Sequence, residues 1–328
     1  MKRNCFMLMV MVFFALSIPA YADQTAEEIL KAIVKIRATV PKEAHTAGTL
    51  GTEREGNGVV IDSKGHILTI GYLIVEADTI EVVGPEDKPV KATFVGYDHS
   101  TGFGLLKTDK PLAVPPMKLG KSSTVKEGDP VIVGGHGGSD AVQAVQVISR
   151  KEFAGYWEYL LDDAISTFPA YPNFAGAALI SRDGQLLGIG SLFSQVRVQG
   201  FGAISCNIFV PIDLLNPILD DLITKGRSSK PSKPWLGINV EETHGRIFIT
   251  QITSGGPAEL AGLQRGDLIL TVKGDSVIGL ADFYRKVWAL GNAGAEIPLT
   301  ILQGTRIRDI TVRSSDRYKF LLEKPKKI

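Results

Sequence analysis

The sequence predicts a mainly β protein of two domains, and three observations support that fold class. Its 328 residues exceed the length of one typical domain. The 35 glycines and 17 prolines favour many turns, and therefore a β-rich fold over a helical bundle. Short apolar runs separated by Gly, Asp and Lys turns recur from Gly56 to about Gly202, and a second set follows Pro234. We expect a larger all-β domain followed by a smaller domain that contains strands and helices.

The first 22 residues are typical of a secretory signal peptide. Lys2 and Arg3 precede an apolar run, and the small residues Ala20 and Ala22 follow it. The run is short for a membrane span of about 20 residues, so cleavage before Asp23 is favoured over an uncleaved anchor. We therefore expect an exported protein, periplasmic or secreted, with no membrane span after cleavage.

The charge and the cysteine content of the chain exclude several classes of function. The formal net charge of the full chain is +1. Cleavage of the signal peptide would remove two of the 36 basic residues and none of the 35 acidic ones, so the expected mature chain has a net charge of −1. Such a balance does not favour binding to nucleic acid or anionic lipid. Cys206 is the one cysteine left, and its apolar segment predicts a packed hydrophobic residue. The spacing of His and Cys predicts no metal site, and no cofactor is expected.

The elements of the larger domain begin with helical spacing over residues 25–32, which leads into a strand. The following strands are short, as in an all-β barrel or sandwich. Helical spacing returns over residues 212–225, and Gly226 occupies the usual position of a C-cap glycine. The predicted strands are NGVVID, HILTI, DTIEVVG, KATFVGYD, FGLLKT, DPVIVGG, AVQVISR, GAALIS, QLLGIGSLF and FGAIS.

A polar, proline-rich segment, RSSKPSKP at residues 227–234, is typical of an interdomain linker. The segments after it predict five strands and two helices in about 80 residues. The strands are WLGINV, RIFITQI, DLILTVKG, IPLTILQG and RDITVRS, and the helices are PAELAGL and ADFYRKVWALG.

Three segments of the larger domain resemble the HtrA/Deg family of exported serine proteases. They are GNGVVIDSKGHILTIGYLI, GYDHSTGFGLLK and YPNFAGAALISRDGQLLGIG, which correspond to the segments with the catalytic histidine, aspartate and serine. The resemblance implies a double six-stranded β-barrel of trypsin type. The positions that fix the alignment around the serine segment are Pro172, Gly176, Leu179, Asp183, Gly184 and Gly188.

All three catalytic positions that this resemblance implies carry other residues. Tyr72 stands in place of the histidine, Gly102 in place of the aspartate and Ala175 in place of the serine. Alanine has no nucleophile, and tyrosine, with a pKa near 10, does not take up a proton at neutral pH. Glycine cannot orient an imidazole. No intact catalytic residue remains, so the sequence predicts a pseudoprotease.

The residues around the empty triad leave some alternatives open. Asn173 stands where the oxyanion loop has glycine, and because Asn tolerates positive φ the loop could keep its shape. His136, in GGHGG, is the one histidine near the former site, and a loop histidine is favoured over a relocated base. Asp98 and His99 are adjacent and so point to opposite faces of a strand. Tyr72 either fills the vacated space, which is favoured, or hydrogen-bonds across the former cleft.

The smaller domain resembles a PDZ domain of the HtrA type. The segments that show this resemblance are WLGI, GGPAELAGLQRGDLIL and VKGDSV. Such domains bind a peptide as an added β-strand and hold its terminal carboxylate with backbone N–H groups. The resemblance implies that Leu236, Gly237 and Ile238 form the carboxylate loop and that Asn239 and Val240 pair with the ligand. It also implies a side-chain pocket lined by Phe283 and Val287, for which core packing is an equal alternative.

These readings divide the chain into a signal peptide (1–22), a trypsin-like domain (23–226), a linker (227–234), a PDZ domain (235–316) and a C-terminal tail (317–328). They predict an exported pseudoprotease that binds peptides or protein C-termini as a regulator or scaffold. Two alternatives are an active serine endopeptidase and an inactive subunit in a mixed oligomer with an active family member. The resemblance also implies homotrimers formed through residues 25–40.

Overall fold

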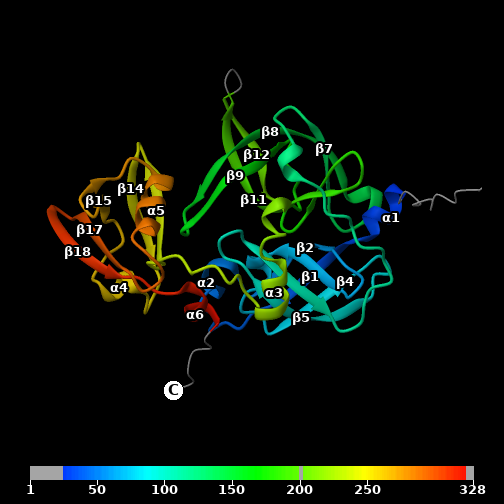
Figure 1. Ribbon diagram of the computed structural model, residues 1–328, viewed down its shortest axis with the longest axis horizontal. Helices are drawn as coiled ribbons and strands as arrows, with labels where there is room; N and C mark the ends of the chain where they lie inside the picture. The colour runs from blue at the N-terminus through cyan, green and yellow to red at the C-terminus, as the bar shows by residue number, and fades with distance from the viewer. Residues whose placement is uncertain (1–24, 199–201, 323–328) are drawn as a thin grey trace, which may run out of the picture.

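The computed structural model describes residues 25–198 and 202–322 (Figure 1). The predicted signal peptide lies outside these ranges, as do the last six residues of the chain. No helix within the described ranges is both long and apolar enough to cross a membrane. The mainly β fold class is confirmed, because two closed barrels and one further sheet contain most of the regular structure.

The first barrel has the strand order β1-β2-β3-β6-β5-β4 and is antiparallel throughout. A short helix precedes it and begins at a capping box, in which Thr25 and Glu28 satisfy each other's backbone N–H groups. The elements are α1 (Ala26–Lys31), β1 (Ile33–Thr39), α2 (Ala47–Leu50), β2 (Glu53–Val60), β3 (His66–Ile70), the 3-10 turn η1 (Gly71–Leu73), β4 (Thr79–Val83), β5 (Pro89–Tyr97) and β6 (Phe103–Thr108).

The second barrel has the order β10-β11-β12-β9-β8-β7, so the chain forms the expected double six-stranded barrel. The helix α3 follows it and ends at Gly226, whose left-handed conformation is that of a C-cap glycine. The elements are η2 (Ser122–Thr124), β7 (Pro130–Gly134), η3 (Gly138–Ala141), β8 (Val142–Gly155), β9 (Tyr159–Phe168), β10 (Ala178–Ile180), β11 (Leu186–Val198), β12 (Gly202–Pro211), η4 (Ile212–Leu214) and α3 (Leu219–Lys225).

The third unit is a sheet of order β13-β14-β15-β17-β18 with β16 paired to β15. The two predicted helices are present, and the linker before the sheet has no helix or strand. The elements are β13 (Ile238–Thr243), β14 (Arg246–Ile252), α4 (Pro257–Leu260), β15 (Leu268–Val272), β16 (Asp275–Ser276), α5 (Leu280–Ala289), β17 (Glu296–Gln303) and β18 (Arg306–Arg313).

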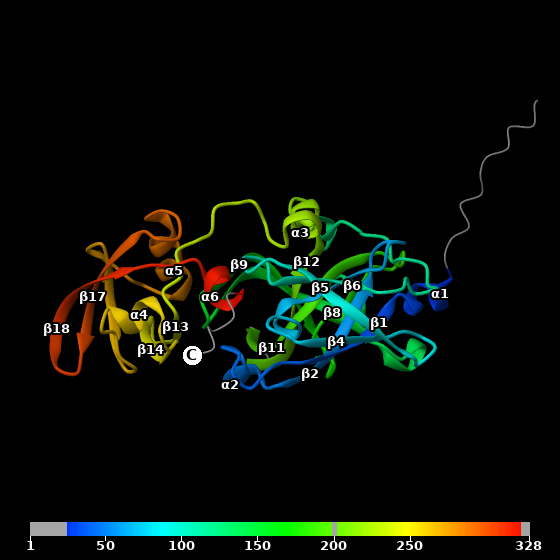
Figure 2. The ribbon, with the colours of Figure 1, turned by 90° about the horizontal axis from the view of Figure 1, so that it is seen from below.

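Two segments connect this sheet to the barrels besides the linker. The long β8–β9 hairpin reaches from the second barrel to the side of α5 (Figure 1). The segment that the sequence assigns to a C-terminal tail contains a helix, α6 (Arg317–Leu322), which lies between the sheet and the barrels (Figure 2). There the Tyr318 hydroxyl accepts a hydrogen bond from the His99 backbone N–H at 2.7 Å. The hairpin of the larger domain therefore contacts the smaller domain, and α6, which follows the smaller domain, contacts the larger one.

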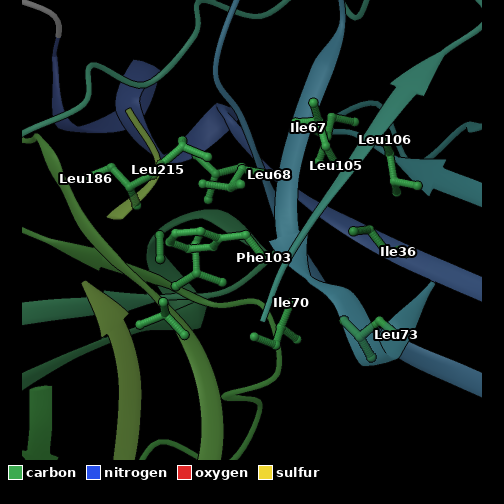
Figure 3. Packing of buried hydrophobic residues seen from close by; sticks show 14 of the residues in the cluster. Ile36, Ile67, Leu68, Ile70, Leu73, Phe103, Leu105, Leu106, Leu186 and Leu215 are labelled. Carbon is green, nitrogen blue, oxygen red and sulfur yellow. The ribbon is translucent and has the colours of Figure 1, made fainter. Parts of the chain in front are cut away.

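The largest hydrophobic core lies between the two barrels. Phe103 of β6 is fully buried and faces Leu68 of β3 and Leu215 after η4 (Figure 3). Leu186 of the second barrel belongs to the same cluster. This cluster contains residues of both barrels, so it fixes the loops at their junction relative to one another, while a second cluster lies within the second barrel.

We expect Phe103→Ala to lower the free energy of unfolding by about 3 to 5 kcal/mol, because it removes a fully buried ring from a close-packed core. Urea unfolding followed by circular dichroism measures this change. Phe193→Ala is the matched control, since that ring is 53% exposed and its loss should cost less than about 1 kcal/mol. Equal losses for the two variants would contradict the central position of Phe103.

Candidate functional site

Tyr72 lies on η1, directly after strand β3, at the junction of the two barrels. Its hydroxyl donates a hydrogen bond to the backbone carbonyl of Ser191 on β11, with an O···O distance of 2.7 Å. The ring also packs against the core between the barrels, so Tyr72 both fills space and bonds across the cleft. Burial raises the pKa of Tyr72 above its usual value. The phenol therefore stays protonated and serves as a structural link between the barrels.

Gly102 lies in the turn between β5 and β6, in a conformation that disfavours an aspartate. Its φ of +83° is in the left-handed region, where a side chain is strained. A Cβ atom at this position would also lie 3.2 Å from the Tyr159 hydroxyl oxygen and 3.2 Å from Ile70 Cδ1. The Tyr159 hydroxyl in turn donates to the Thr101 carbonyl at 2.6 Å. The Tyr159 hydroxyl therefore occupies the space that a side chain at position 102 would enter.

Ala175 lies in the loop between β9 and β10, which Asn57 of β2 holds in place. The Ala175 carbonyl accepts hydrogen bonds from the Asn57 backbone N–H at 2.8 Å and from its side-chain amide at 3.2 Å. The same amide donates to the Asn173 carbonyl at 2.8 Å. Gly176 has a φ of +72°, and a Cβ there would come within 1.9 Å of the Asn57 carbonyl oxygen. The loop is thus well ordered, although it carries no nucleophile.

The expectation that Asn173 adopts a positive φ is wrong. Within the described ranges five non-glycine residues do so, and Asn173 is not one of them. The Asn57 amide that bonds its carbonyl keeps the loop in place without a left-handed residue there. The oxyanion loop therefore does not preserve its shape by means of that substitution.

His136 and His99 make their hydrogen bonds away from Tyr72 and Ala175. The His136 backbone N–H donates to the Asn57 side chain at 2.9 Å, and its Nε2 lies 3.2 Å from the Gly84 carbonyl oxygen. The His99 ring contacts the Glu158 carbonyl, at 3.2 Å, and Arg317, and not the adjacent Asp98. Burial, and then the Arg317 charge, lower the pKa of His99 well below its ordinary value. Neither ring is hydrogen-bonded to Tyr72 or to Ala175.

The carboxylate loop of the smaller domain holds a carboxylate from the larger one. The backbone N–H groups of Leu236 and Gly237 each donate to the Glu158 side chain at 2.8 Å, and that of Ile238 donates at 3.2 Å. Gly237 has a φ of +79°, which lets the loop turn around the anion. These three N–H groups therefore converge on one carboxylate, which comes from the turn between β8 and β9.

The strand that precedes Glu158 continues the contact along β13 and α5. The Val240 backbone N–H donates to the Tyr156 carbonyl at 2.9 Å. On α5, the Tyr284 hydroxyl donates to the Gly155 carbonyl at 2.7 Å and accepts from the Glu158 N–H at 3.0 Å. Residues 155–158 therefore lie in the groove between β13 and α5, where a bound peptide would lie.

The remaining residues predicted to form the peptide site have different surroundings. Phe283 and Val287 are buried in the core of the smaller domain, and Tyr284 beside them contacts the groove. Asn239 bonds the Gln251 side chain on β14 at 3.1 Å. Glu158 and Tyr284 are the site residues that the sequence reading missed. The apolar spacing of ADFYRKVWALG marks a buried face, but it does not distinguish core from groove.

The described residues offer little for metal chemistry or thiol chemistry. Within residues 25–198 and 202–322, no three His, Cys, Asp or Glu side chains lie close enough together to hold a metal ion. Cys206 is buried in β12, and burial raises the pKa of its thiol to about 11. The groups that are positioned for binding are therefore backbone N–H groups and aromatic side chains.

The buried Glu158 carboxylate predicts a dependence of stability on pH. Burial raises its pKa from 4.5 to about 7, although the bonds from the loop and the Arg317 charge act in the opposite direction. Its contribution to stability is therefore complete below pH 4.5 and is lost as the pH rises through 7. Relative to Glu158→Gln, the wild type should lose about 2 kcal/mol of unfolding free energy between pH 5 and pH 8.

Chemical denaturation of both proteins at several pH values measures this difference. His99 and Tyr284, which bond the Glu158 backbone, and Arg317, whose charge acts on the carboxylate, are common to both proteins. The shift of His99, which acts in the opposite direction, therefore cancels in the comparison. A difference that stays constant from pH 5 to pH 8 would contradict the raised pKa of Glu158.

Two family models match the chain. A model of the trypsin-like peptidase domain matches residues 56–189, and a PDZ domain model matches residues 234–313. Curated relatives include proteins named "Probable periplasmic serine endoprotease DegP-like". That of Pseudomonas fluorescens is 29% identical over 78% of this chain and 55% of the relative, and that of Chlamydia pneumoniae is 26% identical over 80% and 55%. The chain spans about half the length of the curated relatives that it matches.

Solved structures of similar fold include two complexes of the HtrA-type protease AlgW. The complex with a decapeptide has a TM-score of 0.51 at 21% identity and covers 88% of this chain and 98% of that chain. The complex with a tripeptide has a TM-score of 0.51 at 22% identity and covers 89% and 97%. At this identity the likeness establishes the fold. The chain therefore contains a trypsin-like peptidase domain followed by a PDZ domain, and in this arrangement it is similar to proteins named as DegP-like periplasmic endoproteases.

Proposed function

We propose that this protein is an exported pseudoprotease that binds peptides or protein C-termini through its PDZ groove and acts as a regulator or scaffold. The observation that carries the proposal is the state of the three catalytic positions. Tyr72 is hydrogen-bonded to Ser191, Gly102 is left-handed beside Tyr159, and Ala175 has no nucleophile. Hydrolysis by the triad mechanism requires a nucleophile, a base and an orienting acid, and the chain supplies none of them there.

The binding part of the proposal rests on the complete carboxylate loop. Its three backbone N–H groups converge on one carboxylate, and the β13 edge offers the Val240 N–H to an added strand. These are the two elements that β-augmentation requires. The names of the relatives, which describe periplasmic endoproteases, support a periplasmic location. The peptide complexes of AlgW support a peptide as the ligand.

An active serine endopeptidase is the second candidate, because the curated relatives are named serine endoproteases. It requires a nucleophile other than residue 175. A third candidate, an inactive subunit in a mixed oligomer with an active family member, requires association through residues 25–40. Light scattering of the purified protein tests this third candidate, since a homogeneous homotrimer without a protease partner would exclude it.

We expect selected peptides from a C-terminal peptide library to bind the purified mature protein and to lose binding in Gly237→Glu. The variant places a side chain and a negative charge where the loop meets the ligand carboxylate, at a left-handed position. Fluorescence anisotropy measures the affinities, and circular dichroism checks the fold of the variant. Peptides that bind both proteins equally would place binding outside this groove.

We expect no cleavage of fluorogenic casein by the wild type or by Ala175→Ser. Restoring the serine alone leaves no base, and loss of a triad lowers turnover by about a million-fold. The triple variant Tyr72→His, Gly102→Asp, Ala175→Ser should stay inactive, because its aspartate is strained at φ +83° and meets Tyr159.

Labelling with a serine-directed fluorophosphonate accompanies the casein assay and detects any activated serine. Wild-type turnover that this reagent abolishes would replace the pseudoprotease with an active endopeptidase. Casein cleavage by the triple variant would show instead that the space beside Gly102 accepts an aspartate.

A further inference from the structure

The turn between β8 and β9 imitates a bound peptide. A peptide ligand of a PDZ domain adds a strand to the groove and places its terminal carboxylate in the backbone loop. Residues 155–158, which we call the hairpin tip, do both: the Tyr156 carbonyl pairs with Val240, and the Glu158 side chain supplies the carboxylate. The groove is therefore filled by the protein's own chain.

The hairpin tip is held by side chains as well as by the backbone. Tyr284 bonds both ends of the tip, at the Gly155 carbonyl and the Glu158 N–H. Arg317 of α6 donates to the Trp157 carbonyl at 2.8 Å. Leu160, which follows the tip on β9, packs in the core cluster of the smaller domain. The tip thus receives side-chain contacts from α5 and α6 in addition to the backbone contacts of residues 236–240, as a segment seated in a built binding site does.

Glu158 has a backbone conformation that its position in the groove explains. Its φ is +59°, in the left-handed region that non-glycine residues rarely adopt. The residue is 3% exposed, and all three loop N–H groups converge on its carboxylate. Such strained residues persist where the surroundings over-determine them, and they cluster at ligand clamps and switches. The turn thus adopts this conformation with its carboxylate seated in the loop.

We propose that the hairpin tip is an internal ligand of the PDZ groove and that an external peptide binds by displacing it. The inference rests on the proposed function, since it describes how the same groove is regulated. A cleft lined by Tyr156, Glu242 and Leu280, among others, flanks the tip and gives a competing peptide access to the groove. The apparent affinity for an external peptide is then the intrinsic affinity of the open groove multiplied by the fraction of molecules in which the groove is open.

The test measures competition between the tip and a peptide of the same sequence. The probe is a fluorescein-labelled octapeptide of residues 151–158 with a free C-terminus, and the control peptide ends in glutamine amide. Both are titrated into the wild type, Glu158→Ala, Glu158→Gln and Glu86→Ala. The last is the matched control, because Glu86 is exposed and pairs with Lys88 on the surface of the first barrel.

We expect Glu158→Ala to bind the probe at least about tenfold more tightly than the wild type or Glu86→Ala. This factor follows if the groove is open in less than about a tenth of wild-type molecules. Glu158→Gln should lie between them, and the control peptide should bind poorly. Equal affinities in all four proteins, or no binding of the probe to Glu158→Ala, would overturn the internal ligand. If no peptide of the C-terminal library binds any variant either, the proposed function fails as well.

Hydrogen exchange of the wild type tests the same displacement without a substitution, in case Glu158→Ala does not fold. A saturating probe should accelerate amide exchange in residues 153–160, because the Glu158 N–H loses its bond to Tyr284. Exchange in this segment that slows or stays constant while the probe binds would overturn the proposal.

Discussion

The contact between the Glu158 carboxylate and the backbone of residues 236–238 determines how the two domains are joined. Burying a charged carboxylate is unfavourable unless it is paired and hydrogen-bonded. Three N–H groups bind it here, yet burial still dominates and raises the pKa of Glu158 to about 7. The surrounding contacts therefore support a group that is costly to bury. They include the Arg317 bond to Trp157 and the ion pairs of Arg285 on α5 with Glu152 and Asp162 of the hairpin.

The junction of the two barrels is held by hydrogen bonds and by packed side chains. The loop that contains Ala175 is held by hydrogen bonds from the Asn57 backbone N–H and from the Asn57 side-chain amide. Side chains at this junction contribute packing and hydrogen bonds: Tyr72 bonds across to β11, and Tyr159 lies beside Gly102. These contacts serve stability whatever chemistry the site performs, because a fold does not by itself imply a function.

Much of this architecture could be predicted from the sequence, because it depends on local patterns. Alternating apolar residues mark the strands, Gly226 marks the end of α3, and Gly237 marks a loop that approaches an anion. The assignment of Tyr72, Gly102 and Ala175 to catalytic positions rests on the resemblance of three segments to a protease family, and not on a local pattern of strands and turns. Glu158 could not be predicted in this way, since a glutamate in a turn between two strands is ordinarily a solvated residue. Its role depends on a contact with residues 78 to 80 positions later in the chain.

Sequence alone also could not show whether Phe283 or Tyr284 contacts the groove. Both residues are buried, but burial in a domain core and burial beneath a docked segment give the same apolar pattern along a helix. Only the position of the hairpin tip makes Tyr284 a groove residue, because the tip supplies the partners of its hydroxyl. A sequence pattern indicates which residues become buried on folding, but it does not indicate which part of the protein buries them.

The cleft and the groove meet at one pair of adjacent residues. Glu158 occupies the carboxylate loop, and Tyr159 places its hydroxyl beside Gly102, where the resemblance implies an aspartate. A carboxylate at position 102 would compete with the Thr101 carbonyl for that hydroxyl and would need a strained backbone. The residues at the start of β9 are thus compatible both with a hairpin tip that lies in the groove and with a glycine at position 102. The two features are compatible because adjacent residues serve them, since the Glu158 side chain enters the carboxylate loop while the Tyr159 hydroxyl bonds the Thr101 carbonyl.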